Sequence, residues 1–235
     1  MRNPIVILGG MGPQASLRFH QLLIEKSMKH HHGDGQDFPH IVHFSLPIAD
    51  FISNEDAEQA AVLRLRHLAT TIRTLQPQQI TLACNTAHLL TKEVDFLQTP
   101  TFVSMLAIMA QKLRQDNVRK IGLIASPTTI RTGLYRVELH KMGMELLIPQ
   151  AKQLTRVEMA IRATISGSVT TLDKDSLLDT ARALAAQGAE AIVLGCTELP
   201  LIFPMEKSPI PVYDCLDIYA NAVIARYYLY NRSTQ

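Results

Sequence analysis

One segment of the chain is repeated further along, and this repeat restricts the possible folds more than any other feature. Residues 80–86 (Ile-Thr-Leu-Ala-Cys-Asn-Thr) are similar to residues 192–198 (Ile-Val-Leu-Gly-Cys-Thr-Glu), and their cysteines are 196 − 84 = 112 residues apart. Two more pairs of similar segments occur in the same order at nearly the same offset, 7–9 with 123–125 and 100–103 with 209–212. The repeat predicts two similar halves, residues 1–104 with 214–235 and residues 105–213.

Each half alternates short apolar runs with longer segments of helical periodicity. The apolar runs predict buried parallel strands at Ile5–Leu8, Ile41–Leu46, Gln79–Ala83, Thr101–Val103, Lys120–Ile124, Glu145–Ile148, Ala191–Leu194 and Pro211–Tyr213. Helices are expected over Glu58–Leu75, Met105–Gln115, Arg156–Ile165, Ser176–Gln187 and Leu216–Tyr230. Because strands that alternate with helices form parallel sheets, we expect an α/β fold of two doubly wound halves, with an active site in the cleft between them.

Composition excludes several classes of protein. A chain of 235 residues with 47% hydrophobic residues can bury two modest cores. Its net charge of +2 is dispersed, so nucleic acid is not an expected partner. The apolar run at Ile5–Leu8 is too short for a signal peptide or a membrane span, and no membrane partner is expected. Three widely spaced cysteines do not form a disulfide framework and suit the reducing cytoplasm.

The repeated cysteines lie where a parallel sheet binds its ligands. Cys84 and Cys196 each follow an apolar strand and begin a polar turn, and such strand ends line the ligand crevice of open α/β sheets. The N-terminus of a following helix would stabilise a thiolate there. If the two halves face each other, one cysteine can remove a proton from one side of a carbon atom while the other returns a proton from the opposite side. The pair predicts inversion of a stereocentre without a metal or an organic cofactor.

A buried, inert thiol is the alternative for any single cysteine, since free cysteines are often buried. The occurrence of cysteine at the same place in both halves favours a function for this pair. Cys215 has no such counterpart, because the equivalent position is Leu106, and we expect it to be structural.

Two polar turns at other strand ends are further candidates. The segment Gly9–Pro13 can bring backbone N–H groups close to an anion, but it lacks the full dinucleotide and phosphate-loop motifs. We expect it to bind a carboxylate, with a tight turn as the alternative. The equivalent segment Ser126–Thr129 can donate hydroxyl and N–H groups, although helix capping explains it equally well.

The histidines give weaker signals. His88 follows Cys84 by four residues, so it either supports the site from behind or belongs to the packing. The run His30-His31-His32 lies in an expected loop, where adjacent histidines do not converge on one ion, and no metal site is expected.

These motifs resemble those of the aspartate/glutamate racemase family, most closely its aspartate racemase branch. The resemblance rests on residues 9–13, 83–88 and 195–199 and extends from the first strand to about Asp214. It implies two flavodoxin-like halves, interconversion of L- and D-amino acids without pyridoxal phosphate, a small amino-acid or dicarboxylate substrate, and a homodimer. It also implies roles for single residues: Cys84 and Cys196 as the two bases, Asn85, Thr86 and Thr197 at the substrate carboxylate, Met11, Ser126 and Thr129 along the pocket, and Glu198 near the amino group.

Two positions depart from the pattern of aspartate racemases. Phe51 and Ser166 stand where that branch carries an arginine and a lysine, the residues that would bind the distal carboxylate. A buried carboxylate without a basic partner is costly, so we expect weaker selectivity for dicarboxylates. Three other arginines could substitute, namely Arg18, Arg131 and Arg162.

Two alternative functions stay open. One is an isomerase or decarboxylase of a small diacid, such as maleate isomerase or arylmalonate decarboxylase, within the same superfamily. The other is a binding protein that closes on an amino acid without catalysis. Rapid modification of one cysteine by a thiol reagent, slowed by ligand, would favour the enzymes.

Overall fold

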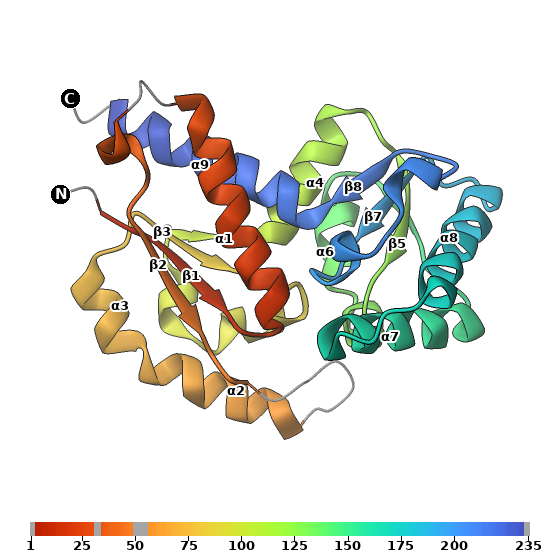
Figure 1. Ribbon diagram of the computed structural model, residues 1–235, viewed down its shortest axis with the longest axis horizontal. Helices are drawn as coiled ribbons and strands as arrows, with labels where there is room; N and C mark the ends of the chain where they lie inside the picture. The colour runs from red at the N-terminus through yellow and green to blue at the C-terminus, as the bar shows by residue number, and fades with distance from the viewer. Residues whose placement is uncertain (1–2, 31–33, 49–55, 233–235) are drawn as a thin grey trace. The chain divides into compact units, whose positions relative to one another are not determined.

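The computed structural model describes residues 3–30, 34–48 and 56–232. The chain divides into two compact units: unit 1 comprises Met1–Met105 with Leu216–Gln235, and unit 2 comprises Leu106–Cys215. Each unit contains a four-stranded sheet and its own helices (Figure 1). The α/β fold with two parallel sheets is therefore confirmed. Within the described part of the chain, no helix combines the length and hydrophobicity needed to cross a membrane.

The sheet of unit 1 has the strand order β2-β1-β3-β4, with all strands parallel. The strands are β1 (Ile5–Gly9), β2 (Ile41–Ser45), β3 (Gln79–Leu82) and β4 (Phe102–Val103). The α-helices are α1 (Pro13–Ser27), α2 (Asp56–His67), α3 (Ala69–Leu75) and α9 (Cys215–Arg232). Short 3-10 helices are η1 (Met28–His30), η2 (Gly35–Asp37), η3 (Thr86–Lys92) and η4 (Asp95–Gln98).

The sheet of unit 2 has the order β6-β5-β7-β8 and is again parallel. The strands are β5 (Lys120–Ile124), β6 (Glu145–Leu147), β7 (Ala191–Leu194) and β8 (Val212–Asp214). The helices are α4 (Met105–Gln115), α5 (Pro127–Thr132), α6 (Leu134–Lys141), α7 (Ala151–Ser166) and α8 (Thr171–Ala186), with the 3-10 helices η5 (Leu199–Leu201) and η6 (Met205–Lys207). In both units the first strand lies between the second and the third, so the two halves share one topology.

Three helices differ from their expected bounds by more than two residues. The helix expected from Ser176 begins at Thr171, where Thr170 and Asp173 form a capping box. The single helix expected over Glu58–Leu75 is interrupted at Leu68, whose N–H bonds the carbonyl of Leu65 at 2.9 Å before α3 begins. The helix expected from Arg156 begins at Ala151 instead, because the side chains of Gln150 and Gln153 satisfy its free N–H groups in a capping box.

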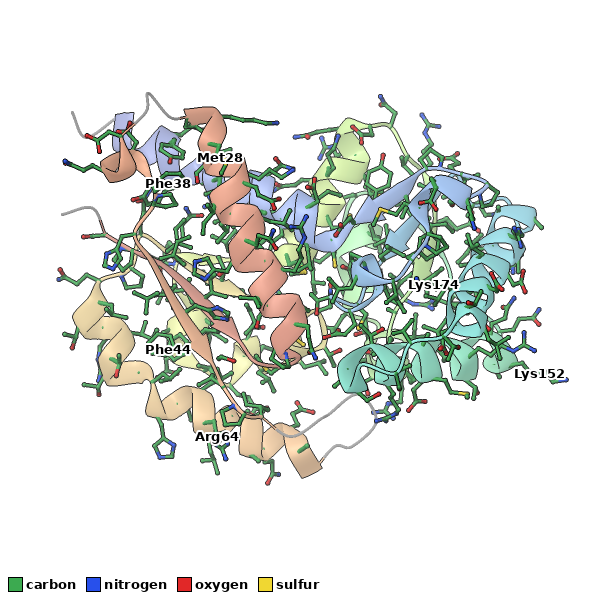
Figure 2. The ribbon with its side chains drawn as sticks, in the orientation of Figure 1. Met28, Phe38, Phe44, Arg64, Lys152 and Lys174 are labelled. Carbon is green, nitrogen blue, oxygen red and sulfur yellow. The ribbon has the colours of Figure 1, made fainter. Side chains whose placement is uncertain are left out.

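The sheet of unit 1 is apolar on both faces, as parallel strands require. One face joins alternate strand residues to α2 and α3 in a cluster that includes Val6, Leu8, Ile80, Leu82, Ala61, Leu65 and Ile72. Phe44 of β2 packs against this cluster and is labelled in Figure 2. The intervening residues of β1 and β3 point to the other face, where the amide of Gln79 donates to the carbonyl of Val223 in α9 at 3.0 Å.

A buried tyrosine of α9 completes the hydrogen bonding of this sheet. The Tyr219 side chain is fully buried and stacks on Phe19 of α1, with ring centroids 4.9 Å apart. Its hydroxyl donates to the carbonyl of Val103 at 2.5 Å and accepts the N–H of Leu82 at 3.2 Å. Because β4 is only two residues long, this hydroxyl takes over where the pairing of β3 with β4 stops.

Replacing Tyr219 with phenylalanine is expected to lower the free energy of unfolding by about 2 kcal/mol, because two buried backbone groups lose their partner. Urea unfolding of the intact chain measures this change. Tyr213→Phe is the control, since its hydroxyl bonds Asp116 at 2.7 Å in an exposed setting and its removal should change stability by less than about 0.5 kcal/mol. Equal effects of the two substitutions would contradict the role given to Tyr219.

Candidate active site

Cys84 directly follows the end of β3 in unit 1. The N–H of Ala83 donates to the carbonyl of Leu8 at 2.9 Å, so the turn after β3 lies beside the turn after β1. Cys84 is buried, with 8% of its surface exposed, and the neighbouring Asn85 and Thr86 are buried as well. Three polar residue types therefore occupy one strand end, where burial without hydrogen bonds would be costly.

The glycine turn after β1 is shaped by close packing. A Cβ atom at Gly9 would lie 2.4 Å from Cβ of Ser16, and one at Gly10 would lie 2.3 Å from the backbone nitrogen of Leu46. Gly10 also has a φ of 91°, which favours glycine. Its N–H donates to the hydroxyl of Ser16 at 3.2 Å. One N–H group of the turn therefore already has a partner, and carboxylate binding by this turn stays a prediction.

Met11, expected to line the pocket, is partly buried and packs against the apolar cluster of unit 1, which includes Cys84. The structure thus brings Met11 to the same apolar cluster as the first thiol.

His88 is a buried residue with both ring nitrogens engaged. Its Nδ1 lies 2.9 Å from the carbonyl oxygen of Cys84, and its Nε2 accepts the N–H of Met105 at 3.2 Å. Because Nε2 accepts, the network assigns the proton of the neutral ring to Nδ1, which donates to Cys84. Burial lowers the pKa of His88 to about 4, an effect partly opposed by its bonds to the backbone of Cys84 and Asn85. His88 therefore fixes the backbone of the cysteine turn and has no nitrogen left for proton transfer.

A helix follows each thiol, as expected, but it is a short 3-10 helix rather than an α-helix. Cys84 is followed by the 3-10 helix Thr86–Lys92, and Cys196 by the three-residue 3-10 helix Leu199–Leu201. A short 3-10 helix has poorer hydrogen-bond geometry than an α-helix. Stabilisation of a thiolate by these helix N-termini stays a prediction.

Cys196 occupies the equivalent place after β7 in unit 2. The N–H of Gly195 donates to the carbonyl of Ile124 at 2.8 Å, matching the bond of Ala83 in unit 1. The position needs glycine, because a Cβ atom there would lie 2.6 Å from Cδ1 of Leu123 and 3.0 Å from the ring of Tyr135. The pKa of Tyr135 is raised well above its usual value. Burial is the largest cause, and charge repulsion from Cys215 and Cys196 adds to it.

A carboxylate directly contacts the second thiol. The Sγ of Cys196 donates to Oε2 of Glu198 at 3.0 Å, and the hydroxyl of Thr197 donates to the same oxygen at 3.1 Å. All three residues are buried, with Glu198 only 5% exposed. A carboxylate at this distance can orient a thiol and accept its proton. The sequence motif predicted Glu198 as a site residue, but it did not predict the bond to Cys196, which depends on the conformation of the turn.

Ser126 and Thr129 lie after β5, the neighbour of β7. The hydroxyl of Ser126 donates to the hydroxyl of Thr129 at 3.0 Å and accepts the N–H of Thr129 at 3.3 Å, capping α5. Both are buried. The capping role is thus present, and their contact with a substrate stays a prediction.

The next residues are the two that replace the expected basic residues, and the three arginines that could substitute for them. Phe51 lies outside the described residues, and Ser166 is exposed at the end of α7, where its hydroxyl lies 2.7 Å from that of Ser168. Arg18 and Arg162 form ion pairs within their own helices, with Glu25 at 2.9 Å and Glu158 at 2.8 Å. Arg131 is exposed in the last turn of α5.

The structure describes one histidine of the run. His31 and His32 lie outside the described residues, while His30 stacks on Tyr228 with ring centroids 4.4 Å apart. Over residues 3–30, 34–48 and 56–232, no three His, Cys, Asp or Glu side chains converge as metal ligands would.

Comparisons with known proteins agree with these motifs. The family model for Asp/Glu/hydantoin racemases matches residues 8–223. The chain is 25% identical to the broad specificity amino-acid racemase RacX of Bacillus subtilis over 232 residues, which cover 96% of this chain and 99% of RacX.

Solved structures show the same fold. The aspartate racemase of Picrophilus torridus has a TM-score of 0.78 at 24% identity, with 96% of this chain and 94% of that chain covered. The glutamate racemase of Francisella tularensis, in complex with D-glutamate, has a TM-score of 0.66 at 17% identity, with 98% and 82% covered. With the family model matching nearly the whole length, the chain belongs to the Asp/Glu/hydantoin racemase family, as the paired cysteine motifs predicted.

Proposed function

We propose that this protein is an amino-acid racemase of the aspartate/glutamate type, acting without a metal or organic cofactor through Cys84 and Cys196. The observation that carries the proposal is the equivalent placement of two buried thiols, each after the third strand of its unit's sheet. Membership of a racemase family and the full-length similarity to an amino-acid racemase support it.

In the proposed reaction, the thiolate of one cysteine removes the proton at Cα, breaking the C–H bond and forming S–H. The electron pair stays on a planar carbanion stabilised by the carboxylate. The thiol of the other cysteine then donates its proton to the opposite side, leaving a thiolate and the other enantiomer. Asn85, Thr86 and Thr197 are proposed to hold the substrate carboxylate, with Met11, Ser126 and Thr129 along the pocket.

Glu198 is proposed to serve Cys196 directly. Its carboxylate already accepts a hydrogen bond from the Cys196 thiol at 3.0 Å, so a proton can pass from sulfur to oxygen to form the thiolate. This role differs from the binding of the substrate amino group that the resemblance implies, and the two can be separated by kinetics.

Glu198→Gln is expected to lower kcat by about 10- to 100-fold while leaving KM within about threefold, because glutamine keeps a hydrogen-bond acceptor but cannot take the proton. Steady-state racemisation of one substrate from both directions measures this. Exposed Glu206→Gln is the control and should change neither constant. A large rise in KM with unchanged kcat would instead support contact with the amino group.

The proposed substrate range is wider than aspartate and glutamate. Ser166, at the place of an expected lysine, is an exposed hydroxyl that cannot neutralise a side-chain carboxylate. The similarity to a racemase named for broad specificity supports the same view.

The test is incubation of each enantiomer of the common amino acids in heavy water, followed by chiral chromatography and mass spectrometry. A two-base racemase places solvent deuterium at Cα of the first product formed, while the remaining substrate keeps its own proton. Product that retains the original proton would point to a single base. Absence of inversion and exchange with every amino acid, and turnover of maleate or a malonate instead, would reject the proposal. Sedimentation of the active protein tests the homodimer that the family resemblance implies.

A further inference from the structure

The carboxyl end of the unit 1 sheet carries an apolar surface beside Cys84. Leu8 of β1 is paired with Phe44 of β2 on one side and with Leu82 of β3 on the other. Leu46 follows Phe44 by two residues and Cys84 follows Leu82 by two, so both belong to the face that Leu8 occupies. Their contacts agree, because Cys84 is part of the apolar cluster on this face and Leu46 packs against that cluster. The thiol and Leu46 thus lie on the same face, one to either side of β1.

The residue between Leu46 and Cys84 is Gly10, which has no side chain. The N–H of Leu46 donates to the carbonyl of Gly9 at 3.0 Å, so these two segments stay paired at the strand ends. Neighbouring strands are about 4.8 Å apart, which puts the backbone of Leu46 roughly 10 Å from that of Cys84. A thiolate removes a proton from a carbon about 3–3.5 Å away. The remaining distance leaves room for the side chain of a substrate between the thiol and Leu46.

Met11, Leu46 and Ile48 together form this apolar surface, the Leu46 wall. All three pack against the apolar cluster of unit 1, yet each is only partly buried. The N–H of Ile48 donates to the carbonyl of Leu46 at 2.8 Å, forming a tight turn that leaves Pro47 exposed. The Leu46 wall therefore has a packed inner side and an apolar outer side that a ligand can reach.

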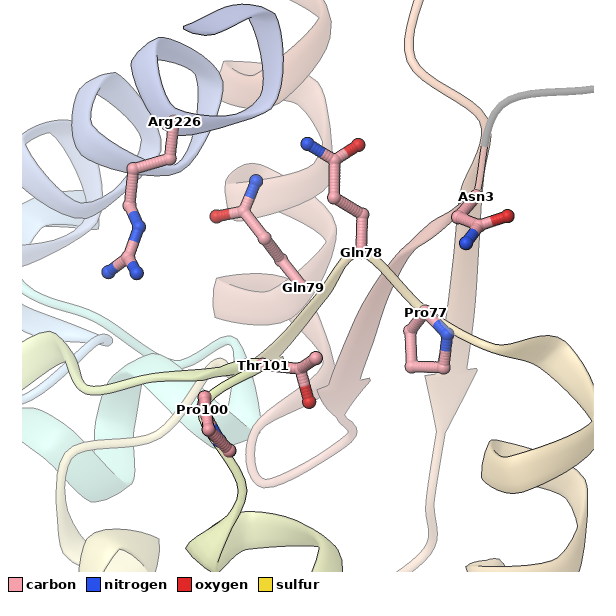
Figure 3. Close-up of a pocket in the computed structure, with 7 residues that line it drawn as sticks. All are labelled: Asn3, Pro77, Gln78, Gln79, Pro100, Thr101 and Arg226. Atoms are coloured by element: carbon pink, nitrogen blue, oxygen red, sulfur yellow. The ribbon is translucent and has the colours of Figure 1, made fainter. Parts of the chain in front are cut away.

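Two arginines of unit 1 that could neutralise a carboxylate are placed elsewhere. Arg18 pairs with Glu25 at 2.9 Å, about two turns farther along α1 from the glycine turn. Arg226 faces a separate cavity that adjoins Gln79, the first residue of β3, whereas Cys84 comes after the last residue of that strand (Figure 3). Both cations therefore lie away from the Leu46 wall.

We infer that the Leu46 wall binds the side chain of the substrate and selects amino acids whose side chains are uncharged, apolar and about the size of leucine or methionine. This inference rests on the proposed racemase function and adds the substrate class to it. An apolar side chain that packs on the wall leaves water with a gain in free energy. A side-chain carboxylate would lose its hydration there without gaining a cation.

Steady-state kinetics with L-leucine, L-alanine and L-aspartate tests the Leu46 wall. In the native chain, kcat/KM for leucine should exceed that for aspartate at least about tenfold. Leu46→Ala should lower kcat/KM for leucine at least about tenfold more than for alanine, because only the longer side chain reaches residue 46. Leu63→Ala is the matched control, since Leu63 of α2 is 57% exposed, and it should change neither value.

Ile48→Ala should change the ratio of leucine to alanine in the same direction, so the test does not depend on the folding of one variant. Faster turnover of aspartate than of leucine would overturn the inference. So would an equal loss on leucine and alanine in variants whose circular dichroism shows that they fold. Either result would leave the proposed function standing, whereas racemisation of no amino acid at all would reject the proposed function and the inference with it.

Discussion

Alanine in place of Cys84 is expected to slow racemisation by about a thousandfold or more, and alanine in place of Cys196 is expected to do the same. In the proposed mechanism, each substitution removes the group that deprotonates one enantiomer and forms the other by protonation. The remaining cysteine can still exchange the Cα proton of the one enantiomer that it faces. Exchange into heavy water without inversion should therefore survive for opposite enantiomers in the two variants.

Cys215→Ala provides the matched control, since Cys215 is a third thiol and is fully buried. It should retain racemase activity within about threefold, although cavity formation will lower stability by about 1 kcal/mol. Circular dichroism of all three variants shows whether they fold. A folded Cys84→Ala or Cys196→Ala variant that racemises within tenfold of the native rate would reject the two-base mechanism.

Acidification from pH 7 to pH 4 is expected to remove about 3 kcal/mol of stability through His88 alone. The pKa of His88 is lowered from 6.5 to about 4 in the folded protein, chiefly by burial. A histidine with a depressed pKa favours the unfolded state once that state begins to bind protons. Its contribution is therefore complete above about pH 6.5 and is lost as the pH falls toward 4. Protonation would also abolish the acceptor that Nε2 offers to Met105.

Urea unfolding at a series of pH values measures this slope. His88→Gln should be less stable than the native chain at pH 7 but should lose about 3 kcal/mol less between pH 7 and pH 4. Burial also lowers the pKa values of His20 and His43, so part of the slope will persist in His88→Gln. An unchanged slope in that variant would contradict the depressed pKa of His88.

The strands were predictable because each parallel strand is buried on both faces and therefore appears as an apolar run. All eight lie within one residue of their expected bounds. The repeat also predicted the common topology of the two units. The interruption at Leu68 was not predictable, because apolar residues keep helical spacing on both sides of it.

The contacts within the site were less predictable than its residues. His88 bonds Met105, which is 17 residues away, and no local pattern encodes such a distance. The bond between Cys196 and Glu198 requires a turn that brings positions two apart together, whereas an α-helix would separate them. The sequence predicted a helix after each cysteine but not that both would be 3-10 helices, so the environment of the thiols was its least detailed part.

Unit 1 is built from two separate segments of the chain, and this affects the order in which the two units can fold during synthesis. All of unit 2, residues 106–215, is translated before α9 is complete. Until then the carbonyl of Val103 and the N–H of Leu82 lack the hydroxyl of Tyr219. The half of the protein that is translated first is therefore the half whose last helix is translated last, so unit 1 cannot complete its fold until synthesis has passed the whole of unit 2.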